Sequence, residues 1–146
     1  MSDTGATSGG RAMTTNGGRA ANLALWALQA ILALQFAMAG LAKLGGDASM
    51  VEMFATIGIG QWFRYLVGAL EIAGAVGVLI PRLSGLAALG LVCLMVGAAI
   101  TNVAVLGASP LLPIVLLVMG ALVAWARREQ TDGGPAREPP ALKRSR

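Results

Sequence analysis

Long runs of apolar residues, separated by short polar or glycine-containing segments, dominate the hydrophobic pattern of the chain. A helix that crosses a bilayer needs about 20 predominantly apolar residues to span a hydrocarbon core of about 30 Å. Runs of about this length lie at residues 23–43, 63–80, 84–106 and 110–126. The pattern therefore predicts an all-α fold, an integral membrane four-helix bundle.

The connection between the first two runs has a different pattern. Gly45 and Gly46 break the first helix, and an apolar side with helical spacing follows at residues 50–57. Gly58 and Gly60 interrupt this side before an aromatic cluster. We expect a short amphipathic segment on the membrane surface between helices 1 and 2.

The two ends of the chain lack such patterns. Residues 1–21 are mainly Gly, Ser, Thr and Asn, and residues 127–146 are basic and proline-containing. Neither segment has an apolar face to bury, so both are predicted to be disordered tails around a bundle at 22–126. Ala37-Met38-Ala39 also permits the alternative that the first run is a signal peptide. The long polar leader and the length of the apolar run favour a retained span.

Composition agrees with a lipid environment. Hydrophobic residues make up 56% of the chain and charged residues only 12%. The net charge of +4 comes mainly from basic residues in the tails, which indicates topology signals and contact with acidic lipid, and not nucleic-acid binding. The absence of histidine excludes the commonest metal ligand, so no metal site is expected, and Cys93 is interpreted as a small packing residue.

Basic residues near the spans predict the orientation. Arg19, Arg82, Arg127 and Arg128 flank one side, whereas the 107–109 turn has no basic residue. We therefore expect both termini in the cytoplasm of a multi-pass plasma membrane protein. The lipid bilayer is its predicted partner, and a homo-oligomer is compatible with the sequence.

This orientation brings scattered polar residues to the same half of the bundle. Glu71 is the central one, because an ionisable group inside an apolar span is costly and usually faces a protein interior or a cavity. Glu71 is the candidate catalytic residue of a polar pocket in the outward half. The candidate ligand-binding residues are Lys43, Arg64, Gln35, Thr101 and Asn102.

Structural roles are the alternative for each of these residues. Glu71 could pair with Lys43 or Arg64 only to hold the helices in register, or it could be a protonated bystander. Lys43 and Arg64 could anchor helix ends at the membrane interface, and Thr101 and Asn102 could bond between helices.

Helical spacing also predicts which faces are buried. Gln29, Phe36 and Lys43 recur on one side of the first span. In the second span, Glu71 shares a face with Arg64, Gly68, Ala75 and Val78, and a neighbouring row of small residues permits close helix approach: Ala69, Ala73 and Gly77.

The order of these features resembles the DoxX family of small four-span membrane proteins, especially its DoxX-like branch. The resemblance covers roughly residues 23–126. The most telling order is Gly40…Lys43, then Gly68…Glu71, then a proline stop at Pro81. The other matching pieces are Phe36, Leu44, Gly58, Trp62, Gly74-Ala75, Leu79-Ile80, Leu86-Ala87-Ala88 and Met95-Val96-Gly97-Ala98.

The resemblance implies a four-helix membrane bundle, with Lys43 and Glu71 at positions typical of the family. It also implies a link to quinone-coupled oxidation, because some relatives are subunits of thiosulfate:quinone oxidoreductase. Many relatives place a histidine near the outer end of the third helix. Thr101-Asn102 stands there in this chain, which departs from that pattern.

Three functions compete at this point. The first is a small subunit of a quinone-linked membrane oxidoreductase system, in which the chain itself binds no resident cofactor and a quinone is the candidate ligand. It would have a soluble or membrane oxidoreductase partner. The second is a non-catalytic membrane anchor or assembly factor for a redox or stress-related complex. A small carrier or channel is the third, disfavoured because the chain lacks a pair of interrupted spans.

Overall fold

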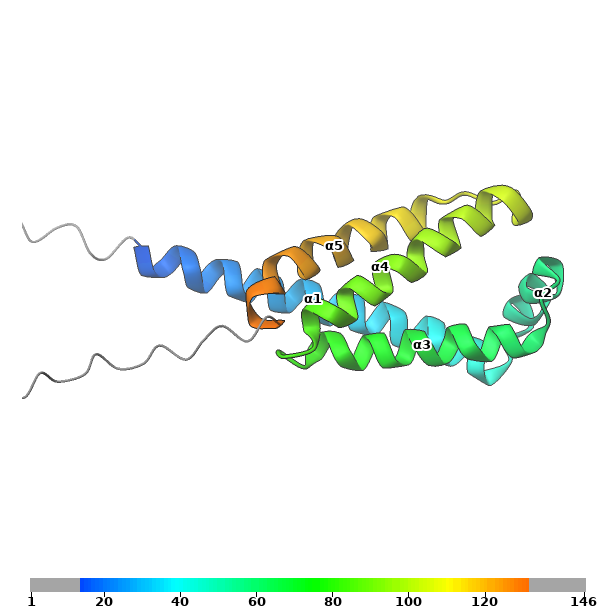
Figure 1. Cartoon of the computed structure of the whole chain (residues 1–146), viewed down its shortest axis with the longest axis horizontal. Helices are drawn as coiled ribbons and strands as arrows, with labels where there is room; N and C mark the ends of the chain where they lie inside the picture. Colours follow the sequence, from blue (N-terminus) through cyan, green and yellow to red (C-terminus); the bar gives the residue numbers. More distant parts are fainter. Residues whose placement is uncertain (1–13, 132–146) are drawn as a thin grey trace, which may run out of the picture.

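The computed structural model describes residues 14–131, and in this range every regular element is helical. Figure 1 labels the main helices of the bundle. The elements are α1 (Thr14–Gly45), α2 (Ala48–Ile57), α3 (Gln61–Leu79), α4 (Ser84–Thr101), the π-helical turn η1 (Asn102–Leu106) and α5 (Leu111–Thr131). The predicted all-α fold is confirmed.

Four of these helical segments are long and apolar enough to cross a membrane. They are Gly18–Gly45, Gln61–Leu79, Ser84–Leu106 and Leu111–Arg128. The four-helix bundle is confirmed, as is the short amphipathic helix between the first two spans.

Two boundaries differ from the predicted tails. α1 already begins at Thr14, inside the polar segment 1–21, and α5 continues to Thr131, beyond the predicted end at 126. An established helix adds one hydrogen bond for each further residue, so it can extend from an apolar span into polar sequence. The predictions of disorder for 1–13 and 132–146 lie outside the described residues.

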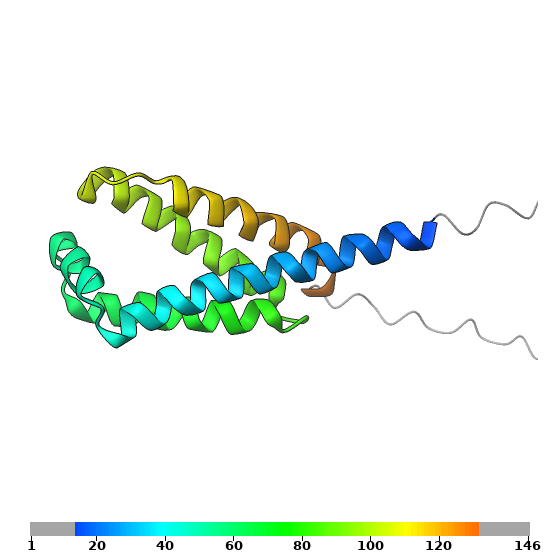
Figure 2. The same cartoon turned by 180° about the vertical axis from the view of Figure 1, so that it is seen from behind.

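The helices form two neighbouring pairs, α1 with α3 and α4 with α5 (Figure 1). The pairs meet where α3 turns into α4, and they separate toward the end that carries α2. The same divergence is visible from behind in Figure 2, where α1 crosses the full length of the bundle. The two pairs are therefore closest at the α3–α4 turn and farthest apart at the α2 end.

The core occupies the region where the pairs are close. Phe36 and Val78 are 1% and 0% exposed, and they pack in one cluster with residues of α4 and α5. The full cluster is Leu32, Ala33, Phe36, Ala75, Val78, Ala88, Leu91, Met95 and Val123. Large apolar side chains elsewhere point outward, such as Leu34 and Ile100, as expected of helices surrounded by lipid.

Glycines bring α1 and α3 into close contact. A Cβ atom at Gly40 would lie 2.8 Å from the carbonyl oxygen of Gly68, and one at Gly68 would lie 3.0 Å from the Cβ of Lys43. Small residues at helix contacts in membranes allow backbones to approach closely. In the predicted small-residue row of α3, Ala69 and Ala73 are instead exposed, and only Gly77 is buried, against Ala87 of α4.

A polar cluster joins α1, α3 and α5 at the end opposite α2. Gln29 is 0% exposed and donates from Nε2 to the carbonyl oxygen of Val78 at 2.7 Å. Arg127, which is 5% exposed, donates from Nη2 to Oε1 of Gln29 at 2.9 Å, and its guanidinium lies over the Trp26 ring. This cluster ties the start of α1's apolar span to the far end of α5.

Candidate functional site

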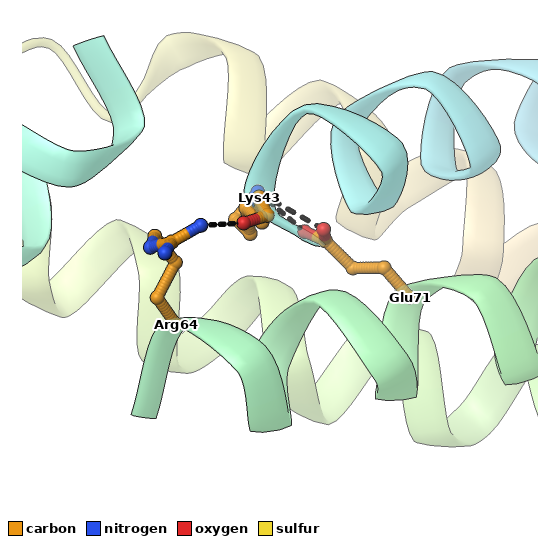
Figure 3. Close-up of polar contacts among 3 residues, drawn as sticks. All are labelled: Lys43, Arg64 and Glu71. Carbon is orange, nitrogen blue, oxygen red and sulfur yellow. Dashed lines mark hydrogen bonds and ion pairs between the residues drawn. The ribbon is translucent and has the colours of Figure 1, made fainter. Parts of the chain in front are cut away.

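The Lys43–Glu71 ion pair joins α1 to α3 in the half of the bundle that carries α2 (Figure 3). Nζ of Lys43 donates to Oε1 of Glu71 at 3.0 Å and lies 2.9 Å from Oε2. The two side chains are only 12% and 4% exposed. Oε2 makes no hydrogen bond within the described residues, although it lies within ion-pair distance of Nζ, so this buried oxygen retains accepting capacity.

Helix geometry explains why these two side chains meet. Glu71 lies on a buried face of α3 that it shares with Arg64, Gly68, Ala75 and Val78. The predicted face of the second span is therefore confirmed. Gly68, one turn before Glu71, leaves the space that the stem of Lys43 occupies.

A cavity of about 460 Å³ lies beside this ion pair. Its walls are mostly apolar, with aromatic rings at Phe36, Phe54 and Phe63, and α2 contributes four side chains to it. The lining residues are Gln35, Phe36, Ala39, Lys43, Met50, Met53, Phe54, Ile57, Phe63, Val67, Glu71, Cys93, Leu94, Met95, Gly97, Ala98, Thr101, Asn102, Leu106, Ser109, Leu112, Pro113 and Leu116. A volume of this size lies in the usual range for small-molecule sites.

Five of the six candidate residues line this cavity: Gln35, Lys43, Glu71, Thr101 and Asn102. Lys43 and Glu71 are in direct contact, and Gln35 is an exposed residue on the same helix as Lys43. Thr101 and Asn102 come from the opposite helix pair, at the junction of α4 with η1. The structure thus gathers these polar side chains around one space.

Thr101 and Asn102 make local hydrogen bonds. Thr101 donates from Oγ1 to the carbonyl oxygen of Gly97 at 2.9 Å, and Asn102 donates from Nδ2 to the carbonyl oxygen of Ser109 at 2.9 Å. Both bonds stay within α4 and the turn that follows it, so neither joins two spans. Ser109, which the sequence did not suggest as a site residue, also lines the cavity.

Arg64 does not line the cavity, which departs from its predicted ligand-binding role. Its side chain is buried against the end of α1, where Nη1 donates to the carbonyl oxygen of Lys43. Its Nε donates to Oε1 of Gln61 at 2.7 Å, and the guanidinium carbon lies 4.3 Å from the centre of the Tyr65 ring. Arg64 therefore contacts Lys43 through the Lys43 backbone and not through its ammonium group.

α2 covers the cavity at the open end of the bundle. Met50, Met53, Phe54 and Ile57 form its cavity-facing side, so the amphipathic helix packs its apolar residues on protein. Asp47 caps the start of α2 by accepting from the backbone N–H of Ser49 at 3.0 Å. The Ser49 hydroxyl and amide hold the pKa of the Asp47 carboxyl below its usual value, because they stabilise the charged form.

Gln61 is a further residue that the sequence reading missed. Its Nε2 donates to the carbonyl oxygen of Val51 in α2 at 3.0 Å, while its Oε1 accepts from Arg64. The three-residue spacing of Gln61 and Arg64 at the start of a helix is a local signal for such a pair. The contacts of Gln61 with α2 and of Arg64 with α1 depend on the tertiary fold, so no local sequence pattern predicts them.

Four apolar spans around a largely buried ion pair and a cavity define a multi-pass integral membrane protein. No group of three or more histidine, cysteine, aspartate or glutamate side chains in residues 14–131 is placed to hold a metal ion. The model of the DoxX-like family matches residues 27–126, so the chain belongs to the DoxX-like family. No curated protein and no solved structure gives a significant match.

Proposed function

We propose that this protein is a small subunit of a quinone-linked membrane oxidoreductase system and binds a quinone in the cavity beside Lys43 and Glu71. The observation that supports this most directly is a buried carboxylate–ammonium pair on the wall of a cavity of about 460 Å³ with mainly apolar lining. A quinone head group is a flat ring with two carbonyl oxygens, so it needs apolar walls and a few hydrogen-bond donors.

The lining residues fit these two needs. Phe36, Phe54 and Phe63 offer aromatic surfaces for a ring. Lys43 has further N–H groups besides the one that donates to Oε1 of Glu71, and Gln35 carries an amide that can donate to a carbonyl oxygen.

Glu71 is the proposed proton-transfer group. Oxidation of a quinol releases two protons and two electrons, and a carboxylate near the hydroxyl can accept one of these protons. The electrons would pass to a redox group of a partner protein, because the proposal assigns no electron acceptor to this chain. Lys43 would hold the carboxylate in place and stabilise its charged form.

The proposed orientation places this site in the outward half of a plasma membrane bundle, with both termini cytoplasmic. Arg82 and Arg128 lie at the end opposite α2 and are exposed, as expected of residues on the cytoplasmic side. At the α2 end, Lys43 and Arg64 are engaged in the buried contacts described above.

Binding of a short-chain ubiquinone analogue and a menaquinone analogue to the purified protein tests the proposal. We expect Glu71→Gln to weaken binding about tenfold, which corresponds to about 1.4 kcal/mol. Glu52→Gln is the matched control, since Glu52 is exposed on α2 and outside the cavity. Equal affinity of wild type and Glu71→Gln would remove Glu71 from the proposal.

Purification in mild detergent tests the partner. An oxidoreductase that co-purifies and reduces or oxidises the analogue supports the subunit role. A redox complex that co-purifies with a chain unable to bind either analogue would instead support the membrane anchor or assembly factor.

A further inference from the structure

Arg64 and Gln61 form a chain of hydrogen bonds from α2 to the backbone of Lys43, the residue whose ammonium group belongs to the buried ion pair. Gln61 donates to the Val51 carbonyl of α2, and Arg64 donates to Gln61 and to the Lys43 carbonyl of α1. Lys43 then contacts Glu71 through its ammonium group. Figure 3 shows Arg64 and Glu71, which lie two turns apart on α3, approaching Lys43 from opposite sides.

We propose that Arg64 is a positioning residue: together with Gln61 it fixes the end of α1 and the overlying α2 so that Lys43 meets Glu71 at the cavity wall. Its importance for activity rests on the proposed function. The positioning of Lys43 against Glu71 is independent of the proposed function, because it concerns only the distance between these two side chains.

The place of Arg64 at the end of α1 explains how it can act. The last carbonyl groups of a helix have no partner within the helix, and a cation near this end also interacts favourably with the helix dipole. The Lys43 carbonyl is one of these last groups, since α1 ends at Gly45. It accepts a long hydrogen bond from the Gly46 amide at 3.4 Å and a second one from Arg64 of α3, so the backbone of Lys43 is bound to the same helix that carries Glu71.

Arginine suits this position for a geometric reason. Its planar guanidinium has several N–H donors in fixed directions, so one group can bind Gln61 and Lys43 at the same time. Tyr65 lies against the guanidinium and restricts it further. Burial of Arg64 to 3% exposure keeps water from replacing these contacts.

Zero-length cross-linking measures the positioning without any quinone. A lipid-soluble carbodiimide, dicyclohexylcarbodiimide, activates the Glu71 carboxyl, and attack by the Lys43 amine forms an amide bond with loss of the urea. Mass spectrometry quantifies the linked peptides. Because the reaction needs close approach of the two groups, a displacement of about 1 Å can change its rate up to about a hundredfold.

We expect Arg64→Met to lower the cross-link yield about tenfold and Arg64→Lys to restore part of it. Arg82→Met is the matched control, because Arg82 is exposed in the turn between α3 and α4. A folded Arg64→Met protein with wild-type yield would overturn the proposal. If Arg64→Met does not fold, Gln61→Leu decides in the same assay: a reduced yield supports the positioning chain, and an unchanged yield overturns it.

A double-mutant cycle then tests the effect on the site. If Arg64 acts through Lys43, Arg64→Met weakens quinone-analogue binding in the wild-type background and causes no further loss of binding in a Lys43→Met background. The thermal stability should fall by the same amount in both backgrounds. Equal losses of binding in the two backgrounds would overturn a role through Lys43. If the wild-type protein binds neither analogue, the proposed function is contradicted. The cross-linking yields would still decide whether Arg64 positions Lys43.

Discussion

Lys43 and Gly68 face each other across the α1–α3 contact at a distance that requires glycine. A Cβ at Gly68 would lie 3.0 Å from the Cβ of Lys43 and 3.1 Å from the Gly40 carbonyl oxygen. Because a backbone oxygen cannot move as a flexible side chain can, the helices would have to separate. The close helix contact and the position of the ion pair therefore depend on the same residue.

Gly68→Ala is expected to destabilise the bundle by about 1–3 kcal/mol, the usual range for overpacking. Thermal unfolding in detergent measures this change. Gly90→Ala is the matched control, because a Cβ at this exposed position of α4 meets nothing within 4 Å. Equal stability of Gly68→Ala and Gly90→Ala would contradict the close contact.

Removing one charge of the buried Lys43–Glu71 pair should lower the stability of the bundle more than removing both charges together. Lys43→Met leaves the Glu71 carboxylate buried without its cation, with an expected loss of about 3–5 kcal/mol. Lys43→Met/Glu71→Met removes both charges and should recover most of this loss. Unfolding temperatures of the single and double variants give the comparison, and a double variant less stable than the single would contradict charge pairing.

At the opposite end, Gln29 and Arg127 should stabilise the bundle independently of the cavity. Arg127→Met removes two donors from the buried Oε1 of Gln29 and should cost about 1–3 kcal/mol. Arg128→Met tests the exposed neighbour, which lies over Trp125, and should change stability little. Quinone-analogue binding should stay unchanged in both folded variants, and a specific loss in Arg127→Met would contradict the separation of the two polar clusters.

The α2 cap should weaken in acid. Because hydrogen bonds lower the Asp47 pKa in the folded protein, the carboxylate stabilises α2 at all pH values above its usual pKa, and this contribution is lost as the pH falls through the lowered folded pKa. Hydrogen exchange of α2 amides measures the effect. Asp47→Asn keeps a capping side chain that does not titrate, so it should differ from wild type only in acid. The test compares the protection of the α2 amides in wild type with that in Asp47→Asn, once at neutral pH and once at pH about 3. If the ratio of the two protections is the same at both pH values, the pH dependence is contradicted.

Cysteine labelling tests the orientation in a Cys93→Ala background. Ala108→Cys lies in the turn before α5 and should react with an impermeant maleimide from outside the cell. Leu83→Cys, in the turn between α3 and α4, is the counterpart and should react only after the membrane is opened. The reverse pattern would place the cavity in the cytoplasmic half.

Periodicity was sufficient to predict the spans and the buried face of α3, because lipid makes long apolar runs and helical spacing strong signals. It also singled out Gln29, Phe36 and Lys43 on one face of α1, and all three side chains are largely buried. The burial of Glu71 followed from the same rule, since a carboxylate in an apolar span has few tolerable environments.

The pairing of particular side chains could not be read in the same way. Arg64 was expected at the cavity because the predicted orientation places it in the same half of the bundle as Glu71, yet two turns of α3 separate the residues and Arg64 meets the α1 backbone instead. Arg127 was assigned to a tail because basic residues usually end a span. Its partner Gln29 is 98 residues away, so no local pattern connects them.

The π-helical turn at Asn102–Leu106 has a consequence for insertions and deletions in this region. A π turn closes its hydrogen bonds over five residues, one more than an α turn. Loss of one residue here would let α4 continue as a regular helix and would rotate the following turn by about 100° around the helix axis. Ser109 would then swing away from Asn102, so this part of the cavity wall is sensitive to chain length as well as to residue type.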